Sequence, residues 1–169
     1  KPFTFALKEA KALSALARKK KVPITSFSVI PQQQSFRDAV AKIRATGKLS
    51  HFITTGPAQI KSPYGGIFFY GIHQVDAIID LLGPNSVQKV QATTDGKTGS
   101  AVLTCKDGVF ATMNFVDNGY HAFHFAAVTD KGYVAWDHKA DENPYLTGAQ
   151  TFVEMFKRSE DTRLNSSHS

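Results

Sequence analysis

The sequence predicts an α+β fold, in which a mostly antiparallel open sheet with helices on one face follows a single helix–strand unit. Up to Gly83, segments with helical and with strand periodicity alternate along the chain. After Gly83, short β-type segments are separated by TDGKTG, KDG, DNG and TDKG, which are typical of hairpin turns. The chain has 169 residues, of which 42% are hydrophobic, enough for one packed domain or for one domain and part of another.

The first helix–strand unit is predicted at residues 4–30. Residues 4–21 favour a helix because apolar side chains recur on one face among strong helix formers. These side chains are Ala6, Ala10, Leu13, Leu16 and Ala17. Residues 22–30, VPITSFSVI, favour a strand, in which Pro23 is tolerated because it lies near the start. We therefore expect a helix followed by a strand before the main body of the fold.

A second helix is predicted at residues 35–46. Ser35 and Asp38 have the spacing of a capping box, and Gly47 is suited to end the helix. The apolar face consists of Phe36, Ala39, Val40 and Ile43. The next segment, KLSHFITTGPAQI at residues 48–60, predicts a strand that runs into a loop.

The segment GGIFFYGIHQVDAIIDLLG, residues 65–83, combines a strand-like aromatic run with an amphipathic helix predicted at residues 73–82. The apolar stripe of this helix consists of Val75, Ile78, Ile79 and Leu82. His73, Asp76 and Asp80 have the spacing that stacks side chains on the opposite face. We therefore expect a titratable histidine and a carboxylate together where an aromatic strand becomes a helix.

Short strands in an antiparallel meander are predicted at residues 87–93, 100–105, 109–115, 120–129 and 133–138. A last helix is predicted at residues 143–157, with Pro144 near its start. Helices can cover only one face of such a sheet, so the other face should need a partner surface. The apolar rows available for it are Val109, Ala111, Met113 and Phe115, or Phe123 and Phe125. We therefore expect a homo-oligomer that forms through the open sheet face.

Charge and composition argue against several classes of protein. The net charge is +6, but the densest basic run, residues 18–21, ends the first predicted helix, and we expect no nucleic-acid partner. No apolar run approaches the roughly 20 residues needed to cross a bilayer, and no leader pattern is visible. We therefore expect no membrane partner and a cytoplasmic location. His121 and His124 would face opposite sides of a strand, so no metal site is expected.

The order of these elements and the motif around His73 resemble the Gfo/Idh/MocA family, which includes glucose–fructose oxidoreductase and inositol dehydrogenase. In that family a Glu-Lys-Pro motif precedes a helix and a strand, and an Asp-x-Gly-x-His-x-x-Asp motif follows in the second domain. The matching positions are Lys1 and Pro2 for the first motif, and Gly71, His73 and Asp76 for the second.

The resemblance implies that the chain has three parts. Residues 1–29 would be the C-terminal remnant of a dinucleotide-binding Rossmann domain, and residues 30–157 would be most of an α+β domain for substrate binding and oligomerisation. Residues 158–169 resemble the translated read-through of a sequencing adapter and are treated as a non-native tail. Because the first helix would have lost the sheet that it covers, its face with Ala10, Leu13 and Leu16 should be exposed or packed against the segment ITSFSV.

By the same resemblance, the chain is expected to be a fragment of an NAD(P)-dependent oxidoreductase acting on a sugar, a polyol or a related hydroxy compound. The full-length parent would bind NAD or NADP. The fragment would bind neither, because the sequence has no Gly-x-Gly-x-x-Gly motif to cradle a dinucleotide pyrophosphate.

The resemblance also implies roles for particular residues. His73 and Lys1 would be catalytic, since a histidine suits the transfer of the hydroxyl proton. Tyr70 and Asp76 would bind the substrate, and Lys1 and Pro2 would lie against the cofactor. From the residues alone, His73 could instead be one polar residue on a solvated helix face. Asp76 could orient His73 or favour the positive end of its helix, and Tyr70 could pack in the core.

One position differs from the family motif. Phe69 stands where the family has its first Asp, and an apolar ring can neither relay a proton nor bind a hydroxyl. This difference supports a second hypothesis, a non-catalytic sugar-binding or assembly protein of the same fold.

Overall fold

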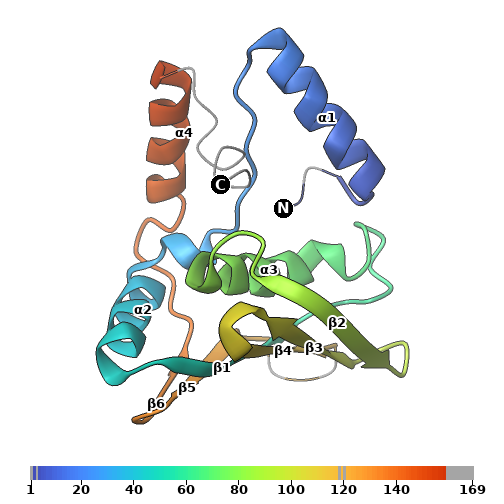
Figure 1. The fold of residues 1–169 in the computed structure, drawn as a ribbon. Helices are drawn as coiled ribbons and strands as arrows, with labels where there is room; N and C mark the ends of the chain where they lie inside the picture. Colours follow the sequence, from blue (N-terminus) through green and yellow to red (C-terminus); the bar gives the residue numbers. More distant parts are fainter. Residues whose placement is uncertain (1, 3, 118, 120, 159–169) are drawn as a thin grey trace.

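The computed structural model describes residues 2, 4–117, 119 and 121–158. In chain order the elements are α1 (Leu7–Lys20), a 3₁₀ turn (Ile30–Gln32), α2 (Gln34–Thr46), β1 (Leu49–Pro57), α3 (Phe68–Leu82), β2 (Val87–Thr94), β3 (Gly99–Cys105), a second 3₁₀ turn (Lys106–Gly108), β4 (Phe110–Val116), β5 (His124–Thr129), β6 (Tyr133–Asp137) and α4 (Leu146–Arg158). Helices α2 and α3 lie on one face of a six-stranded sheet, and α1 and α4 lie on the side of α3 away from that sheet (Figure 1). The predicted α+β class, with helices on one face, is confirmed.

The sheet has the strand order β2-β3-β4-β1-β5-β6. Its neighbouring strands are antiparallel except for β1 and β4, which are parallel. The sheet is thus mostly antiparallel as predicted, but the strands after Gly83 do not form an uninterrupted meander, because β1 lies between β4 and β5. The ring of Phe52 on β1 is fully buried and stacks with Phe125 and Trp136 at 6.1 and 6.2 Å, so β1 supplies the centre of the core.

The open face of the sheet differs from the expected one. Ala111, Met113 and Phe115 are buried on the face covered by the helices, and Phe125 is fully buried there too. The two apolar rows proposed for a partner surface are therefore core rows. The open face instead has a cross-strand row in which Phe110, His51, Val128 and Tyr133 are register partners on β4, β1, β5 and β6.

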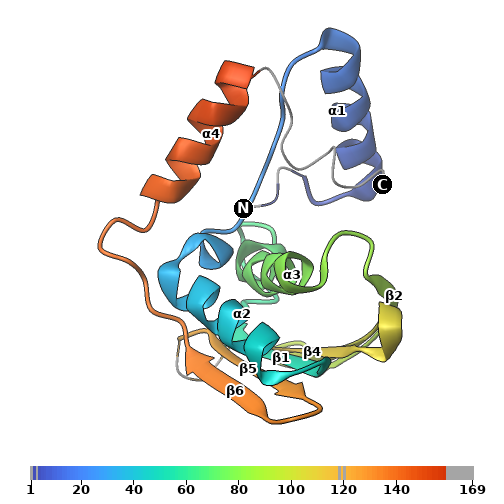
Figure 2. The same cartoon turned by 60° about the vertical axis from the view of Figure 1, so that its left-hand side comes forward.

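The segment before α2 forms a helix but no strand. Helix α1 is as predicted to within three residues at its start. Leu13 and Leu16 are 38% and 51% exposed, as expected, whereas Ala10 is half-buried. Residues 22–29 have no strand assignment, so the predicted strand is wrong. A strand requires a hydrogen-bonded neighbour, and the sheet of this molecule lies on the far side of α3 from this segment (Figure 2).

The start of α2 also differs from the prediction. The N-cap residue is Gln33, without a side-chain cap, and the hydroxyl of Ser35 donates to the carbonyl of Lys139 at 2.9 Å. The predicted capping box is therefore wrong, because Ser35 binds a segment distant in sequence. Gly47 ends the helix as predicted. The fully buried side chain of Gln33 donates to the carbonyl of Pro144 at 2.8 Å and so joins α2 to the segment before α4.

Within the described part of the chain, no helix is both long enough and apolar enough to span a bilayer. The single cysteine, Cys105, is buried on β3, and burial raises the pKa of its thiol.

Candidate functional site

Helix α3 begins earlier than the sequence pattern indicates. The aromatic run is the first turn of this helix rather than a strand, and a turn with positive φ at Gly65 (+103°) and Gly66 (+60°) precedes it. At Gly71 a Cβ atom would lie 3.3 Å from Cγ1 of Ile67 and 3.4 Å from the ring of Phe115 on β4, so Gly71 lies where the helix faces the sheet. His73 therefore lies more than one turn inside α3, not at its start.

The buried face of α3 overlaps the predicted one only in part, because Ile78 of the expected stripe is buried and Leu82 is partly buried against the core. Gln74, Ala77 and Ile78 are at most 1% exposed, whereas Val75 and Ile79 of the expected apolar stripe are 36% and 41% exposed. The buried amide of Gln74 accepts a hydrogen bond from the Thr54 hydroxyl at 2.7 Å and donates to the carbonyl of Asn114 at 3.1 Å. Two polar groups of the sheet thus turn the helix so that a glutamine faces the core.

The rotation of α3 brings His73 and Asp76 to the segment before the first 3₁₀ turn. Nδ1 of His73 lies 2.6 Å from Oγ of Ser28, and the backbone N–H of Ser28 donates to Oδ2 of Asp76 at 2.7 Å. Ser28 is 1% exposed and Asp76 is 8% exposed, so the carboxylate of Asp76 is buried. His73 and Asp76 are therefore joined through Ser28, which lies 45 positions before His73 in the chain.

Aromatic rings surround His73. Its ring centroid lies 6.4 Å from that of Tyr70 and 5.4 Å from that of Phe123, and Tyr70 packs edge-on against Phe69 at 4.9 Å. The ring of Tyr64 continues this row beyond Phe69, at 5.3 Å. An aromatic row beside a histidine and a buried carboxylate is a mostly apolar surface with a few polar groups, as small-molecule sites usually are.

His138 lies at the other end of the aromatic row, with its ring 6.5 Å from that of Phe123. Its buried Nδ1 has no hydrogen-bond partner among the described residues. Burial lowers the pKa of His138, and the charge of Asp141 only partly offsets this. His138 is therefore neutral near pH 7.

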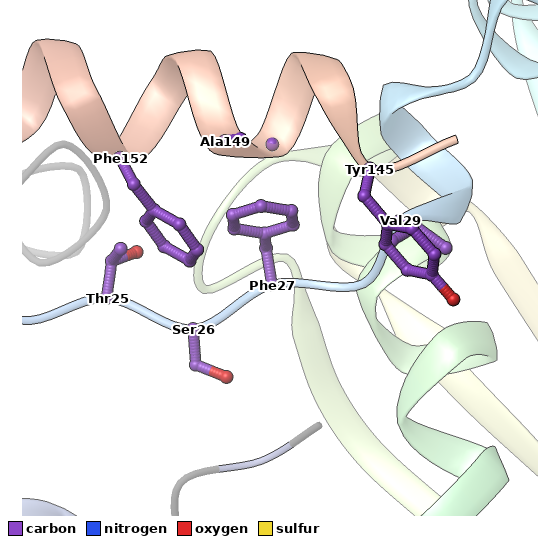
Figure 3. Close-up of a pocket in the computed structure, with 8 residues that line it drawn as sticks. Thr25, Ser26, Phe27, Val29, Tyr145, Ala149 and Phe152 are labelled. Atoms are coloured by element: carbon purple, nitrogen blue, oxygen red, sulfur yellow. The ribbon is translucent and has the colours of Figure 1, made fainter. Parts of the chain in front are cut away.

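A groove of about 500 Å³ lies between residues 25–29 and α4 (Figure 3). Figure 3 shows the side chains of Thr25 and Phe27 directed toward α4 and that of Ser26 directed away from it. The ring of Phe27 packs against that of Phe152 at 4.9 Å. Successive side chains of this segment thus point to opposite sides, as in a strand, although the segment has no strand assignment. The side chain of Ser28 therefore points toward α3 and not toward α4.

The predicted site residues have different outcomes. Tyr70 and Asp76 lie beside His73, the first by ring contact and the second through Ser28. Lys1 lies outside the described residues. Pro2 is half-buried in the irregular segment before α1, and the described contacts do not bring it to His73. No sequence signal marks Ser28, because it looks like one position of an alternating strand.

Comparisons with protein-family models and with curated proteins give no match. Solved structures do match. A probable dehydrogenase from Thermotoga maritima has 18% identity and a TM-score of 0.80, over 96% of this chain and 63% of that one. The myo-inositol 2-dehydrogenase from Lactobacillus plantarum has 18% identity and a TM-score of 0.77, over 96% and 63%. KijD10, a 3-ketoreductase from Actinomadura kijaniata solved with TDP-benzene and NADP, has 17% identity and a TM-score of 0.74, over 97% and 62%.

The chain has the fold of the Gfo/Idh/MocA dehydrogenases. The match covers 96% of the chain, so it is not limited to the sheet. At 17–18% identity the likeness is one of fold. The chain spans less than two thirds of each of these Gfo/Idh/MocA-type proteins.

Proposed function

We propose that this chain is part of an NAD(P)-dependent oxidoreductase that acts on a sugar, a polyol or a related hydroxy compound, with His73 as the acid/base. The observation that supports this most is the placement of His73, which lies between Ser28 and a row of aromatic rings in a dehydrogenase fold. Fold alone does not imply activity, so the proposal depends on this side-chain arrangement.

In this proposal His73 of this chain performs the proton transfer of the reaction. Oxidation of a secondary alcohol removes a hydride from carbon and a proton from oxygen, and histidine suits the second task near neutral pH. Tyr70 would contact the substrate from the same helix. Asp76 would act on His73 indirectly, since its carboxylate accepts a hydrogen bond from the backbone N–H of Ser28, which contacts His73.

We propose that the described residues hold no dinucleotide site. A pyrophosphate usually binds to unpaired N–H groups at a helix N-terminus after a glycine-rich turn. Here the first N–H of α2 already donates to the carboxylate of Asp141, at 3.1 Å to each oxygen, and the sequence has no Gly-x-Gly-x-x-Gly. We therefore propose that the NAD(P) site and Lys1 belong to a nucleotide domain of which residues 1–29 are the end, and we assign no hydride step to this chain.

A second candidate function is a non-catalytic sugar-binding or assembly protein. Phe69 favours it, because its ring packs against Tyr64 and Tyr70 where the family motif has an acid. Such a row of rings could hold a sugar by stacking without any proton transfer.

We further propose that the open sheet face mediates self-association. Val102, Phe110, Val128 and Tyr133 lie on this face and are 39–77% exposed. The helices cover the opposite face, so a second copy of the chain is the simplest cover for these side chains.

The test of the proposed reaction uses the full-length protein that contains this chain. Turnover would be measured with NAD and NADP across sugars and polyols, for the wild type, His73→Ala and the control His124→Ala, an exposed histidine on β5. We expect His73→Ala to lower kcat by roughly 10²- to 10⁴-fold and the control to keep it. Full kcat in His73→Ala would overturn the acid/base role.

The same preparation separates the two candidate functions. Sugar binding without turnover in the wild type would favour the non-catalytic protein. NADH fluorescence titrated with the 169-residue chain by itself should show no saturable binding. Micromolar binding by this chain would contradict the proposal that the nucleotide domain lies outside it.

A further inference from the structure

We propose that Ser28 is a positioning residue for His73, whose Nδ1 it holds so that Nε2 exchanges the proton with the substrate. This inference rests on the proposed acid/base function of His73. Ser28 lies 45 positions before His73 in the chain, in the extended segment between α1 and the first 3₁₀ turn, so only the tertiary structure brings the two together.

The hydroxyl of Ser28 is itself held in place. It accepts the backbone N–H of Ile30 at 3.1 Å and lies 2.6 Å from Nδ1 of His73, while the backbone N–H of Ser28 donates to Asp76 at 2.7 Å. Ser28 and Ile30 are each 1% exposed. Loss of a hydrogen bond at such a buried position costs free energy of folding. The bonds to Ile30 and Asp76 therefore hold Ser28, and with it the contact to His73, in place.

A hydroxyl suits a histidine that changes its protonation state. The tautomer that can act as a base at Nε2 is the one in which Nδ1–H donates to Oγ of Ser28, because its basic lone pair is then on Nε2. When the substrate hydroxyl gives its proton to Nε2, the imidazolium keeps the same bond from Nδ1 to Oγ. The proton then leaves from Nε2 to solvent. One proton thus enters and leaves at one nitrogen while the ring stays in place.

Asp76 acts one step further away. Its carboxylate binds the Ser28 backbone and comes from the next turn of the same helix as His73. The extended segment and α3 are therefore joined at two adjacent points, the Ser28 hydroxyl and the Ser28 amide. This arrangement resists rotation of the His73 ring, and an error of about 1 Å in such a ring can lower a rate by about 100-fold.

The direct test is the tautomer of His73 in the 169-residue chain. Long-range ¹H–¹⁵N spectra of histidine-labelled protein report which nitrogen holds the proton and at what pH the ring titrates. The variants are Ser28→Ala and Ser28→Thr. The control is Ser50→Ala, because the Ser50 hydroxyl lies 3.1 Å from Nδ1 of His51 in a matched but exposed serine–histidine pair.

We expect neutral wild-type His73 to be protonated at Nδ1, and Ser28→Ala to mix the two tautomers and to shift the titration midpoint. Ser28→Thr should behave as the wild type, and Ser50→Ala should leave the His73 signals unchanged. Wild-type signals for His73 in Ser28→Ala would overturn the proposal. So would loss of the wild-type tautomer in a folded Ser28→Thr, because threonine keeps the hydroxyl.

Kinetics of the full-length protein complete the test. Ser28→Ala should lower kcat by roughly 10- to 100-fold with little change in KM, and Ser28→Thr should restore most of it. An equal loss in both variants would overturn the positioning role. If Ser28→Ala alters the tautomer but His73→Ala keeps full kcat, the positioning of the ring by Ser28 stands and the proposed function of His73 fails.

Discussion

Buried polar side chains in this molecule differ in whether they have a partner. Asp76 is 8% exposed, and its carboxylate accepts a hydrogen bond from the backbone N–H of Ser28, so this buried group has a partner. Nδ1 of His138 is buried with no partner among the described residues. Protonation of such a buried ring would lower the free energy of unfolding, so the stability of the protein should depend on pH through His138.

We predict that His138 makes the protein less stable in mild acid. Burial lowers its pKa in the folded state, so the unfolded chain binds more protons once the pH falls toward the ordinary histidine pKa of about 6.5. The contribution of neutral His138 is complete above that pH and is lost as the pH falls below it. Urea unfolding at pH 5.5 and 7.5 should show a smaller loss for His138→Phe than for the wild type.

The control for this prediction is His121→Gln, because His121 is an exposed histidine. This variant should lose as much stability between the two pH values as the wild type does. Equal acid sensitivity of His138→Phe and the wild type would show that other groups are responsible.

At the scale of the elements, α3 decides the geometry of the site. Its orientation depends on Gln74, which binds Thr54 on β1 and Asn114 on β4. A helix turned to bury Val75 and Ile79 would direct His73 and Asp76 away from Ser28. The polar contacts under the helix therefore help to place the residues of the candidate site.

We predict that Gln74→Ala is more destabilising than Ile79→Ala. The first removes a fully buried side chain together with its hydrogen bonds to the Thr54 hydroxyl and the Asn114 carbonyl, at a cost of about 2–4 kcal/mol. The second removes a side chain that is 41% exposed, at a cost of about 0.5–1 kcal/mol. The free energy of unfolding from urea titration checks the order. The reverse order would mean that α3 buries the stripe indicated by hydrophobic periodicity.

At the scale of the whole molecule, two apolar surfaces are exposed in different places. One is the open sheet face with Phe110, Val128 and Tyr133, and the other is the α1 surface with Leu13 and Leu16. The sheet face is a flat row across neighbouring strands, which suits a second copy of itself. The α1 surface would instead cover the nucleotide domain proposed above.

We predict that charges on the sheet face weaken self-association. Phe110→Lys and Val128→Lys place like charges opposite each other in a two-fold interface and should raise the dissociation constant by at least about tenfold. Sedimentation velocity over a micromolar concentration range measures this. Leu16→Lys on α1 is the matched control and should leave the sedimentation unchanged. A wild-type chain that is monomeric at high micromolar concentration would contradict the prediction.

Much of the fold and part of the site could be predicted from local pattern. The sequences TDGKTG, KDG and TDKG marked the hairpins β2–β3, β3–β4 and β5–β6, because hairpin turns require particular residues at fixed positions. DNG marked no hairpin, because β4 and β5 each pair with β1. Gly47 marked the end of α2 for a similar reason. The motif around His73 indicated the fold family, and Tyr70 and Asp76 do lie near His73. Ser28 could not be predicted, since its partner is 45 residues away.

The sequence by itself determined the class of fold and the existence of most elements, because turn chemistry and periodicity act over a few neighbouring residues. The tertiary structure decided the place of β1 between β4 and β5, the buried face of α3 and the loss of the strand at residues 22–29. Each depends on partners distant in the chain: Phe125 for Phe52, Thr54 and Asn114 for Gln74, and a neighbouring strand for residues 22–29. Hydrogen bonding and packing across such distances are satisfied only when the whole chain has folded, and local patterns do not encode them.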